Sequence, residues 1–281
     1  TEKILESLLT RPDFYVRVNT LKTTPEAVID ELTAEGFEVL PGRFLNEALI
    51  IRNISDISSL KAYAEGRVTV QDESSMLVTK VLDPKPGEKI LDVCAAPGGK
   101  STHIAEHMKN EGYIVAWDIH EHKLDLIRNN ARRLGVNIIE PALRDALEPV
   151  NEPEGKFHRV LVDAPCSGTG IIRRKPDIKW HRRPEDFGNL VEIQQKILYN
   201  ASRYVMPGGV LVYSTCSLDP RENSAVVNAF IRENTNFIPE PISGMPGIIG
   251  DKKEAAGGML NLFPHIDGTD GFFIAKLKKN K

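Results

Sequence analysis

Cysteine is scarce in this sequence, whose 281 residues include only Cys94, Cys166 and Cys216. The three stand far apart, and no two of them have the paired spacing that zinc sites use. Isolated thiols of this kind do not build a disulfide framework either. We therefore expect three reduced thiols and no structural metal.

Long apolar runs are also missing, since no stretch approaches the roughly 20 residues that cross a bilayer. No charged leader followed by an apolar segment and a cleavage site is found. These absences predict a cytoplasmic protein that does not bind membranes. A basic excess is lacking as well, because the formal net charge is -3. Any nucleic-acid partner would therefore have to be held by a local cluster of cations.

Apolar residues are plentiful, at 41% of the chain, which is enough for one sizeable domain and a smaller one. We assign residues 1–65 to a small α+β accessory domain. Thr24 and Pro25 are typical of a helix start, and Gly36 is typical of its end. Strands are predicted at residues 14–18, 37–40 and 48–52.

Residues 66–281 show a regular alternation of strand-length apolar runs and helical segments. This alternation is typical of βαβ units, so we predict a Rossmann-like α/β domain with a twisted, mainly parallel sheet. A helix after residue 70 is expected to be capped by Asp72 or Ser74. The five predicted strands are residues 89–93, 113–117, 136–139, 160–162 and 210–213.

Polar or reactive residues follow each of these five strands. In an open α/β sheet, ligands bind beyond the carboxyl ends of the strands, so these residues should gather around one crevice. Each of them alone has a plainer explanation, such as a tight turn, a solvated loop or a small buried hydrophobe. The residues are the turn 94–100, Asp118, Asp145, Asp163 with Cys166 just after it, and Cys216.

The turn at residues 94–100 opens a helix, and its glycines let a ligand approach the backbone closely. It has neither the phosphate-loop spacing nor the dinucleotide spacing Gly-x-Gly-x-x-Gly. Asp118 suits the two hydroxyls of a ribose, and Asp145 could accept from an adenine amino group. Together they favour an adenosine-containing cofactor without pyrophosphate, which points to S-adenosyl-methionine.

A methyl group on that cofactor needs a nucleophile. Carbon-5 of cytosine is too weak unaided, but a thiolate that adds to carbon-6 converts the ring into an enamine. We interpret Cys216 as this thiolate, and Cys166, at a neighbouring strand end, as a partner thiol. Sequence spacing alone leaves open which of the two attacks.

At this point the sequence resembles the Sun-type RNA 5-methylcytosine methyltransferases. The similar motifs are residues 70–74, 94–100, 163–170, 213–217 and 270–277, and residues 170–180 most resemble the bacterial RsmB branch, which modifies small-subunit ribosomal RNA. The family's bacterial members commonly carry a helical N-terminal RNA-binding domain, which we do not find in these residues. A small β-α-β-β unit such as residues 1–65 is often an RNA-contacting accessory, so we expect RNA contact there, although such a fold has many uses and the composition is not basic.

The resemblance also implies roles for single residues. The Thr-Cys thiol, here Cys216, is the family's nucleophile, and the Pro-Cys thiol, here Cys166, assists release of the methylated base. DNA cytosine-5 methyltransferases use a Pro-Cys nucleophile instead. The cofactor contacts that carry over are Cys94, Ala95, Ala96, Pro97, Gly98, Gly99, Lys100, Asp118, Asp145 and Asp163.

Residues 173–183 hold six cations around Trp180 and His181. Cations interleaved with an aromatic ring suit a loop that grips the RNA backbone and stacks on a base, although such a run can also be a solvated face. The target cytosine should be unpaired or flipped out, since a base inside a helix cannot reach a thiol in a crevice.

Two other functions compete with this one. An RNA-binding assembly factor could keep the fold without chemistry, but it would need neither thiol. A nicotinamide dehydrogenase is disfavoured by the spacing of the glycines.

Overall fold

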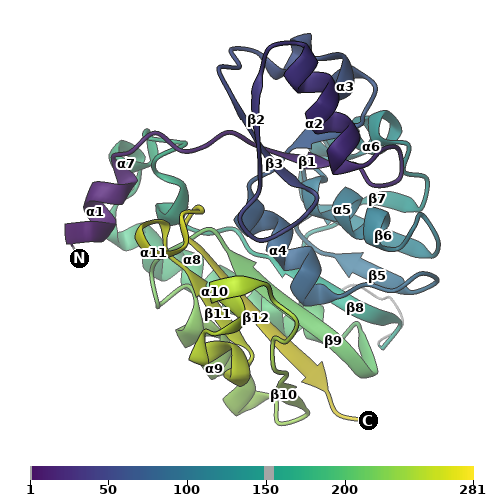
Figure 1. The fold of residues 1–281 in the computed structure, drawn as a ribbon. Helices are drawn as coiled ribbons and strands as arrows, with labels where there is room; N and C mark the ends of the chain where they lie inside the picture. The colour runs from purple at the N-terminus through teal and green to yellow at the C-terminus, as the bar shows by residue number, and fades with distance from the viewer. Residues whose placement is uncertain (1, 149–154) are drawn as a thin grey trace.

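The computed structural model describes residues 2–148 and 155–281, which form two β-sheets packed side by side with helices around them (Figure 1). A four-stranded sheet belongs to the N-terminal part of the chain, and an eight-stranded sheet belongs to the rest. None of the described helices is long and apolar enough to cross a membrane.

The small sheet is antiparallel and has the strand order β2-β3-β1-β4. Its strands bury Val16, Val18, Leu49 and Ile51 against Val28 and Leu32 of α2, which explains why the alternating and helical patterns occur together here. The Thr24 hydroxyl accepts from the Ala27 amide at the start of α2, as predicted. The elements are α1 (Glu2–Leu8), β1 (Tyr15–Val18), α2 (Pro25–Ala34), β2 (Glu38–Pro41), β3 (Ala48–Arg52), a 3₁₀ turn (Ile57–Ser59), α3 (Lys61–Ala64) and β4 (Val68–Val70).

The large sheet has the order β10-β12-β9-β8-β5-β6-β7, with β11 paired to β12. Strands β9, β8, β5, β6 and β7 are parallel, which confirms the predicted Rossmann-like core. The strands are β5 (Lys89–Asp92), β6 (Tyr113–Asp118), β7 (Ile139–Leu143), β8 (Phe157–Asp163), β9 (Val205–Thr215), β10 (Phe237–Pro239), β11 (Met259–Leu262) and β12 (Phe272–Lys279).

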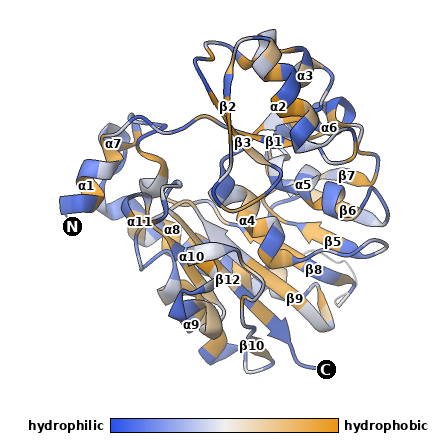
Figure 2. Ribbon diagram, in the orientation of Figure 1, coloured by the Kyte–Doolittle hydropathy of each residue, from blue (hydrophilic) through white to orange (hydrophobic). Residues whose placement is uncertain are grey.

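Helices cover both faces of this sheet. Along β9, Val210 and Val212 pack with α4 and α5, whereas Leu211 and Tyr213 pack with α8 and α9. Figure 2 shows the central strands as largely hydrophobic between helices with polar outer surfaces. The helices of this part are α4 (Glu73–Leu82), α5 (Gly99–His107), α6 (Glu121–Leu134), α7 (Ile178–His181), α8 (Pro184–Ser202), α9 (Ser224–Glu233), α10 (Gly247–Gly250) and α11 (Pro264–Asp267), with 3₁₀ turns at Thr169–Ile171 and Lys253–Gly257.

Two details differ from the sequence predictions. The third parallel strand was predicted at residues 136–139 but lies at Ile139–Leu143, because Val136 packs into the core at the end of α6 and residues 137 and 138 lead into the strand. Strand β12 was not predicted, and it pairs antiparallel with β9.

Asp72 caps α4, as one of the two predicted alternatives. The domain boundary after residue 65 stays a prediction.

A buried ion pair joins the two sheets. Arg17 of β1 and Glu106 of α5 are both inaccessible to solvent, and their closest nitrogen and oxygen atoms are 2.8 Å apart. The same guanidinium donates to the Gly99 carbonyl oxygen at 2.8 Å and to the Thr102 hydroxyl at 3.1 Å. The small sheet therefore contacts the first turn of the helix that follows the glycine-rich turn.

Candidate active site

A cavity of about 600 Å³ lies at the carboxyl ends of the parallel strands. The chain runs outward from β5 to β7 and then returns to β8 and β9, so the strand order reverses between β5 and β8. Ligands of open α/β sheets bind at this kind of switch point. Predicted residues from several strand ends line the cavity together, namely Cys94, Ala96, Asp118, Asp145, Asp163, Cys166 and Cys216.

Two acidic residues stand on the β6 and β7 side of the cavity. Asp118 ends β6, is nearly buried, and accepts from the His120 amide at 2.9 Å. Asp145 accepts from the Leu147 amide at 2.8 Å. In both residues, the hydrogen bond from the backbone amide uses one carboxylate oxygen and holds the loop after the strand in place. The carboxylate keeps further lone pairs that can accept hydrogen bonds from a ligand.

The glycine-rich turn divides into a lining part and a supporting part. Cys94 and Ala96 line the cavity, whereas Ala95, Pro97, Gly98, Gly99 and Lys100 are outside its lining. Gly98 has a φ of 97° and stands directly before α5, a conformation that favours glycine. Of the residues predicted to contact the cofactor in this turn, two therefore line the cavity and five do not.

Lys100 acts on the site through Asp163. Its Nζ lies 2.6 Å from one carboxylate oxygen of Asp163, and the Ser214 hydroxyl donates to the other oxygen at 2.8 Å. Burial is the largest single effect and would lower the pKa of Lys100, but the charge and hydrogen bond of Asp163, together with the charge of Asp92, outweigh it and raise that pKa. A cation is thus held beside the carboxyl ends of β8 and β9.

The two thiols expected at neighbouring strand ends meet. The Sγ atoms of Cys166 and Cys216 are 3.3 Å apart, and both residues are partly buried. The contact with Cys166 lowers the pKa of Cys216, and the charge of Lys100 adds to this effect against burial and Asp163. The same contact, together with burial, raises the pKa of Cys166. The two sulfur atoms are close enough for either thiol to donate to the other, and the charge of Lys100 favours Cys216 as the one that carries the negative charge.

Glu222 ties the two thiol-bearing loops together, and sequence reasoning missed it. Its buried carboxylate accepts from the Ser167 amide at 2.8 Å, from the Ser167 hydroxyl at 2.5 Å and from Gln194 at 3.0 Å. The Ser217 hydroxyl donates to the same carboxylate. One side chain thus holds the residues that directly follow Cys166 and Cys216. The Pro-Arg-Glu sequence around it is typical of a solvated turn, so no local signal marks it.

The backbones of the two loops also touch. The Gly170 amide donates to the Cys216 carbonyl oxygen at 2.9 Å. A Cβ atom at Gly170 would lie 2.0 Å from the Gly271 carbonyl oxygen, so no side chain fits there.

Asp92 is a second residue that the sequence analysis did not single out. It ends β5, is fully buried behind the glycine-rich turn and accepts from the Ser101 hydroxyl at 2.6 Å. Burial raises the pKa of Asp92 to about 6.

The basic loop at residues 173–183 is only partly a free surface. Arg173 and Arg174 both form ion pairs with Asp270, and Arg174 also pairs with Asp72 at 2.5 Å, so these two cations are structural. Arg182 donates to the carbonyl oxygens of Cys166 and Ser167, both at 3.1 Å. Trp180 is 83% exposed. The remaining cations Lys175, Lys179 and Arg183 are exposed beside it.

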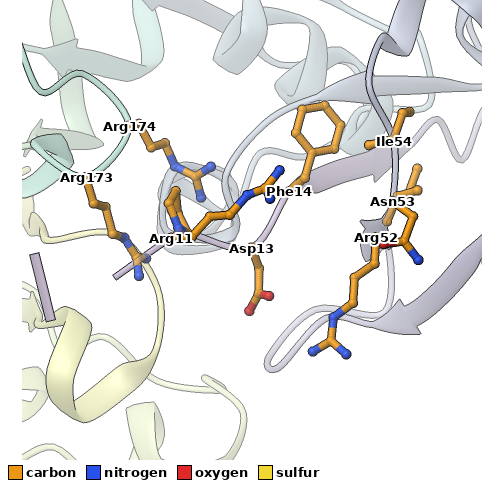
Figure 3. Close-up of a pocket in the computed structure, with 10 residues that line it drawn as sticks. Arg11, Asp13, Phe14, Arg52, Asn53, Ile54, Arg173 and Arg174 are labelled. Carbon is orange, nitrogen blue, oxygen red and sulfur yellow. The ribbon is translucent and has the colours of Figure 1, made fainter. Parts of the chain in front are cut away.

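A second groove, of about 520 Å³, lies between the small sheet and this loop. Figure 3 shows Arg173 and Arg174 on one side of the groove and Arg52 on the other, with Arg11 between them. Phe14 and Ile54 supply apolar lining. Such a surface suits a nucleic-acid backbone with a base nearby.

Comparison with known proteins identifies the family. The model described as 16S rRNA methyltransferase RsmB/F matches residues 79–278. The chain belongs to this family. Residues 1–58 match the ferredoxin-like domain of the RsmF/B-like methyltransferases, in agreement with the four-stranded sheet. Membership of the RsmB/F family confirms the resemblance noted from the motifs.

Several relatives of this RsmB/F chain are similar over almost its whole length. A Bacillus subtilis protein called probable ribosomal RNA small subunit methyltransferase B is 44% identical over 99% of this chain and 62% of its own length. A methyltransferase homolog protein from Pyrococcus horikoshii has a solved structure with TM-score 0.84 and 33% identity, over 99% of this chain and 90% of that one. NSun6 from Pyrococcus horikoshii, solved with SFG, has TM-score 0.87 and 27% identity, over 100% and 94%.

Proposed function

We propose that this chain methylates carbon-5 of a cytosine in RNA, with S-adenosyl-methionine as methyl donor and small-subunit ribosomal RNA as substrate. The chain spans 62% of the length of the curated relative from Bacillus subtilis, so the activity of the whole protein is part of this proposal. The observation that carries it is the pair of thiols 3.3 Å apart at the edge of the cavity. The predicted cytoplasmic location stays a prediction.

The lining of the cavity fits an adenosine-containing methyl donor. Asp118 and Asp145 offer carboxylate acceptors on one side, and Cys94 and Ala96 border the same space. A related structure was solved with SFG, an analogue of S-adenosyl-methionine. When bound, the cofactor supplies an electrophilic methyl group.

The two thiols divide the remaining work. The Cys216 thiolate adds to carbon-6 of the cytosine, which makes carbon-5 nucleophilic enough to take a methyl group. Once Cys216 is bonded to carbon-6, the Cys166 thiol gives its proton to solvent, and the resulting thiolate removes the proton from carbon-5, directly or through water. The electrons of that C–H bond reform the ring double bond, and Cys216 leaves as a thiolate. Cys166 is then a thiol again and Cys216 a thiolate, which is the starting state of the pair.

The exposed surface beside the thiols suits an unpaired RNA target. Trp180 of α7 offers a stacking face near the exposed cations Lys175, Lys179 and Arg183, and Arg182 links this loop to the backbone of Cys166. The groove between the small sheet and the basic loop, lined by arginines, would continue the path of the RNA backbone. A target cytosine held here is flipped out of its stack.

The test is methyl transfer from labelled S-adenosyl-methionine to a small-subunit ribosomal RNA transcript, followed by nucleoside analysis. We expect 5-methylcytosine as the product, and more of it from a looped-out cytosine than from the same cytosine in a duplex. A non-catalytic RNA-binding factor would bind the transcript without transferring label. Label in a different nucleoside, or equal labelling of both RNAs, would contradict the proposal.

A further inference from the structure

A cluster of metal-ligating side chains lies away from the thiols, at the junction between the small sheet and α5. His103 and His107 are one helical turn apart on α5, so their rings lie on the same face. Glu47 directly precedes β3 and lies opposite them. The ligand atoms of the three residues all lie within 4.8 Å of one another.

The two distances from the Glu47 carboxylate to the histidine rings fit a tetrahedral ion. Glu47 Oε1 is 3.5 Å from His103 Nε2 and 3.5 Å from His107 Nε2. Two ligands that are each about 2.0–2.2 Å from a tetrahedral zinc ion lie roughly 3.3–3.6 Å from each other. The backbone of Glu47 is fixed as well, since its carbonyl oxygen accepts from the Val18 amide at 2.7 Å.

Hydrogen bonding does not account for His103. Its side chain is 1% exposed, and neither ring nitrogen has a hydrogen-bond partner within residues 2–148 and 155–281. Buried polar groups are normally paired, so an orphan imidazole aimed at a carboxylate requires an explanation.

The surrounding charges leave room for a cation. Arg17 lies close by, but Glu106 pairs with it at 2.8 Å and offsets its charge. A cavity of about 420 Å³ borders Glu47, His103 and His107, so an ion and its remaining water ligand can enter from solvent. Lys80 is the other cation that lines this cavity.

We propose that Glu47, His103 and His107 form a binding site for a divalent transition-metal ion, with Zn²⁺ as the best fit to two imidazoles and one carboxylate. The ion clamps the loop before β3 of the small sheet to α5, beside the Arg17 and Glu106 ion pair. This site lies outside the proposed methyl-transfer cavity. Cysteine spacing offered no sign of it, because the donors are imidazole and carboxylate groups on distant segments.

The test is zinc titration of the 281-residue chain after removal of metal by a chelator. Because the paired thiols could also bind Zn²⁺, the titration is run on the Cys166→Ser/Cys216→Ser variant as well as on the unmodified chain. We expect one Zn²⁺ per chain in the serine variant and a thermal unfolding midpoint that rises with Zn²⁺ concentration. Co²⁺ should give the visible bands of a four-coordinate nitrogen and oxygen site without thiolate charge transfer.

Two variants and a matched control assign the ligands. Even supporting partners of metal ligands cost about 10–100-fold in affinity when removed, so His107→Ala should weaken binding at least about tenfold. His122→Ala removes an exposed histidine of α6 and should leave zinc affinity unchanged. Glu47→Gln keeps the shape of the carboxylate and decides the question if His107→Ala fails to fold.

Three outcomes would overturn the proposal. The first is a folded serine variant that binds no Zn²⁺ at micromolar concentration. The second is equal zinc affinity in Glu47→Gln, His107→Ala and the His122→Ala control. The third is binding that the unmodified chain shows and the serine variant loses, which would assign the ion to the thiols.

Discussion

The loops that carry Cys166 and Cys216 follow neighbouring parallel strands, yet their surroundings differ. Cys216 comes directly after β9, close to the ion pair of Lys100 and Asp163. Cys166 lies beyond the end of β8, and Arg182 donates a hydrogen bond to the backbone carbonyl oxygen of Cys166. The sheet edge explains why both thiols reach one cavity. The local charges explain why the two thiols differ in acidity.

This difference bears on which thiol attacks. Contact with Cys166 and the charge of Lys100 lower the pKa of Cys216, whereas the same contact and burial raise the pKa of Cys166. The thiolate is the reactive form of cysteine, so the electrostatics favour Cys216 as nucleophile and Cys166 as proton acceptor at a later step. In the opposite assignment, the Pro-Cys thiol, here Cys166, is the nucleophile, as in DNA cytosine-5 methyltransferases. The experiments below distinguish the two assignments.

The largest effect is expected from Cys216→Ser. Loss of the attacking thiolate should lower the methyl-transfer rate at least about 10⁴-fold, as for other enzymes that lose their nucleophile. Labelled methyl transfer to RNA measures the rate, and an unchanged thermal unfolding midpoint shows that the fold is intact. Activity close to that of the unmodified chain would show that Cys216 is not the nucleophile.

Cys166→Ser should separate methyl transfer from product release. The first turnover should persist, whereas the steady-state rate should fall about 10²–10⁴-fold, the usual contribution of a general base. Single-turnover and multiple-turnover kinetics measure the two rates. An unchanged thermal unfolding midpoint shows that the fold of the variant is intact. If the single-turnover and multiple-turnover rates fell by the same factor, Cys166 would not act specifically in product release.

Glu222→Gln should weaken the tie between the two loops. An amide group places a donor against the donors of Ser167 and Gln194, and an unsatisfied buried group costs about 1–3 kcal/mol of unfolding free energy. As a positioning residue, Glu222 should change kcat more than the KM for the cofactor. Glu192→Gln, an exposed change on α8, controls for loss of charge. Equal kinetics in both variants would show that the loops hold their positions without Glu222.

The smallest effect concerns pH. Without the cation, the pKa of Cys216 should rise, so Lys100→Met should shift the acidic limb of the rate profile to higher pH. The rate loss should therefore be greatest at low pH and recover as pH rises. Lys100→Arg keeps the charge and should restore the profile. An unchanged pH profile in Lys100→Met would show that Lys100 does not lower the pKa of Cys216.

Much of the fold could be predicted, because strand-length apolar runs and helix caps are local signals. Asp118, Asp145 and Cys216 could be placed at one crevice, since carboxyl ends of parallel strands share an edge. The register of the third strand failed, because Val136 is buried in the core outside any strand. Strand β12 escaped prediction because its pairing with β9 is a long-range contact.

The supporting residues of the site could not be predicted from local patterns. Arg173 and Arg174 were counted among the cations of an RNA-contacting loop, but their partner Asp270 is almost a hundred residues away. Glu222 stands in a charged turn and is nevertheless buried. Such long-range pairs leave no periodic signal, so only the folded chain reveals which charges are structural.

The most direct test of the account identifies the cysteine that becomes linked to RNA. Cys166→Ser is incubated with substrate RNA and S-adenosyl-methionine, and the covalent complex is digested and mapped by mass spectrometry. Because this variant should form the thioether but release it slowly, we predict a nucleotide adduct on the peptide that contains Cys216. An adduct on Cys166 in the Cys216→Ser variant, with none on Cys216 in Cys166→Ser, would contradict the account.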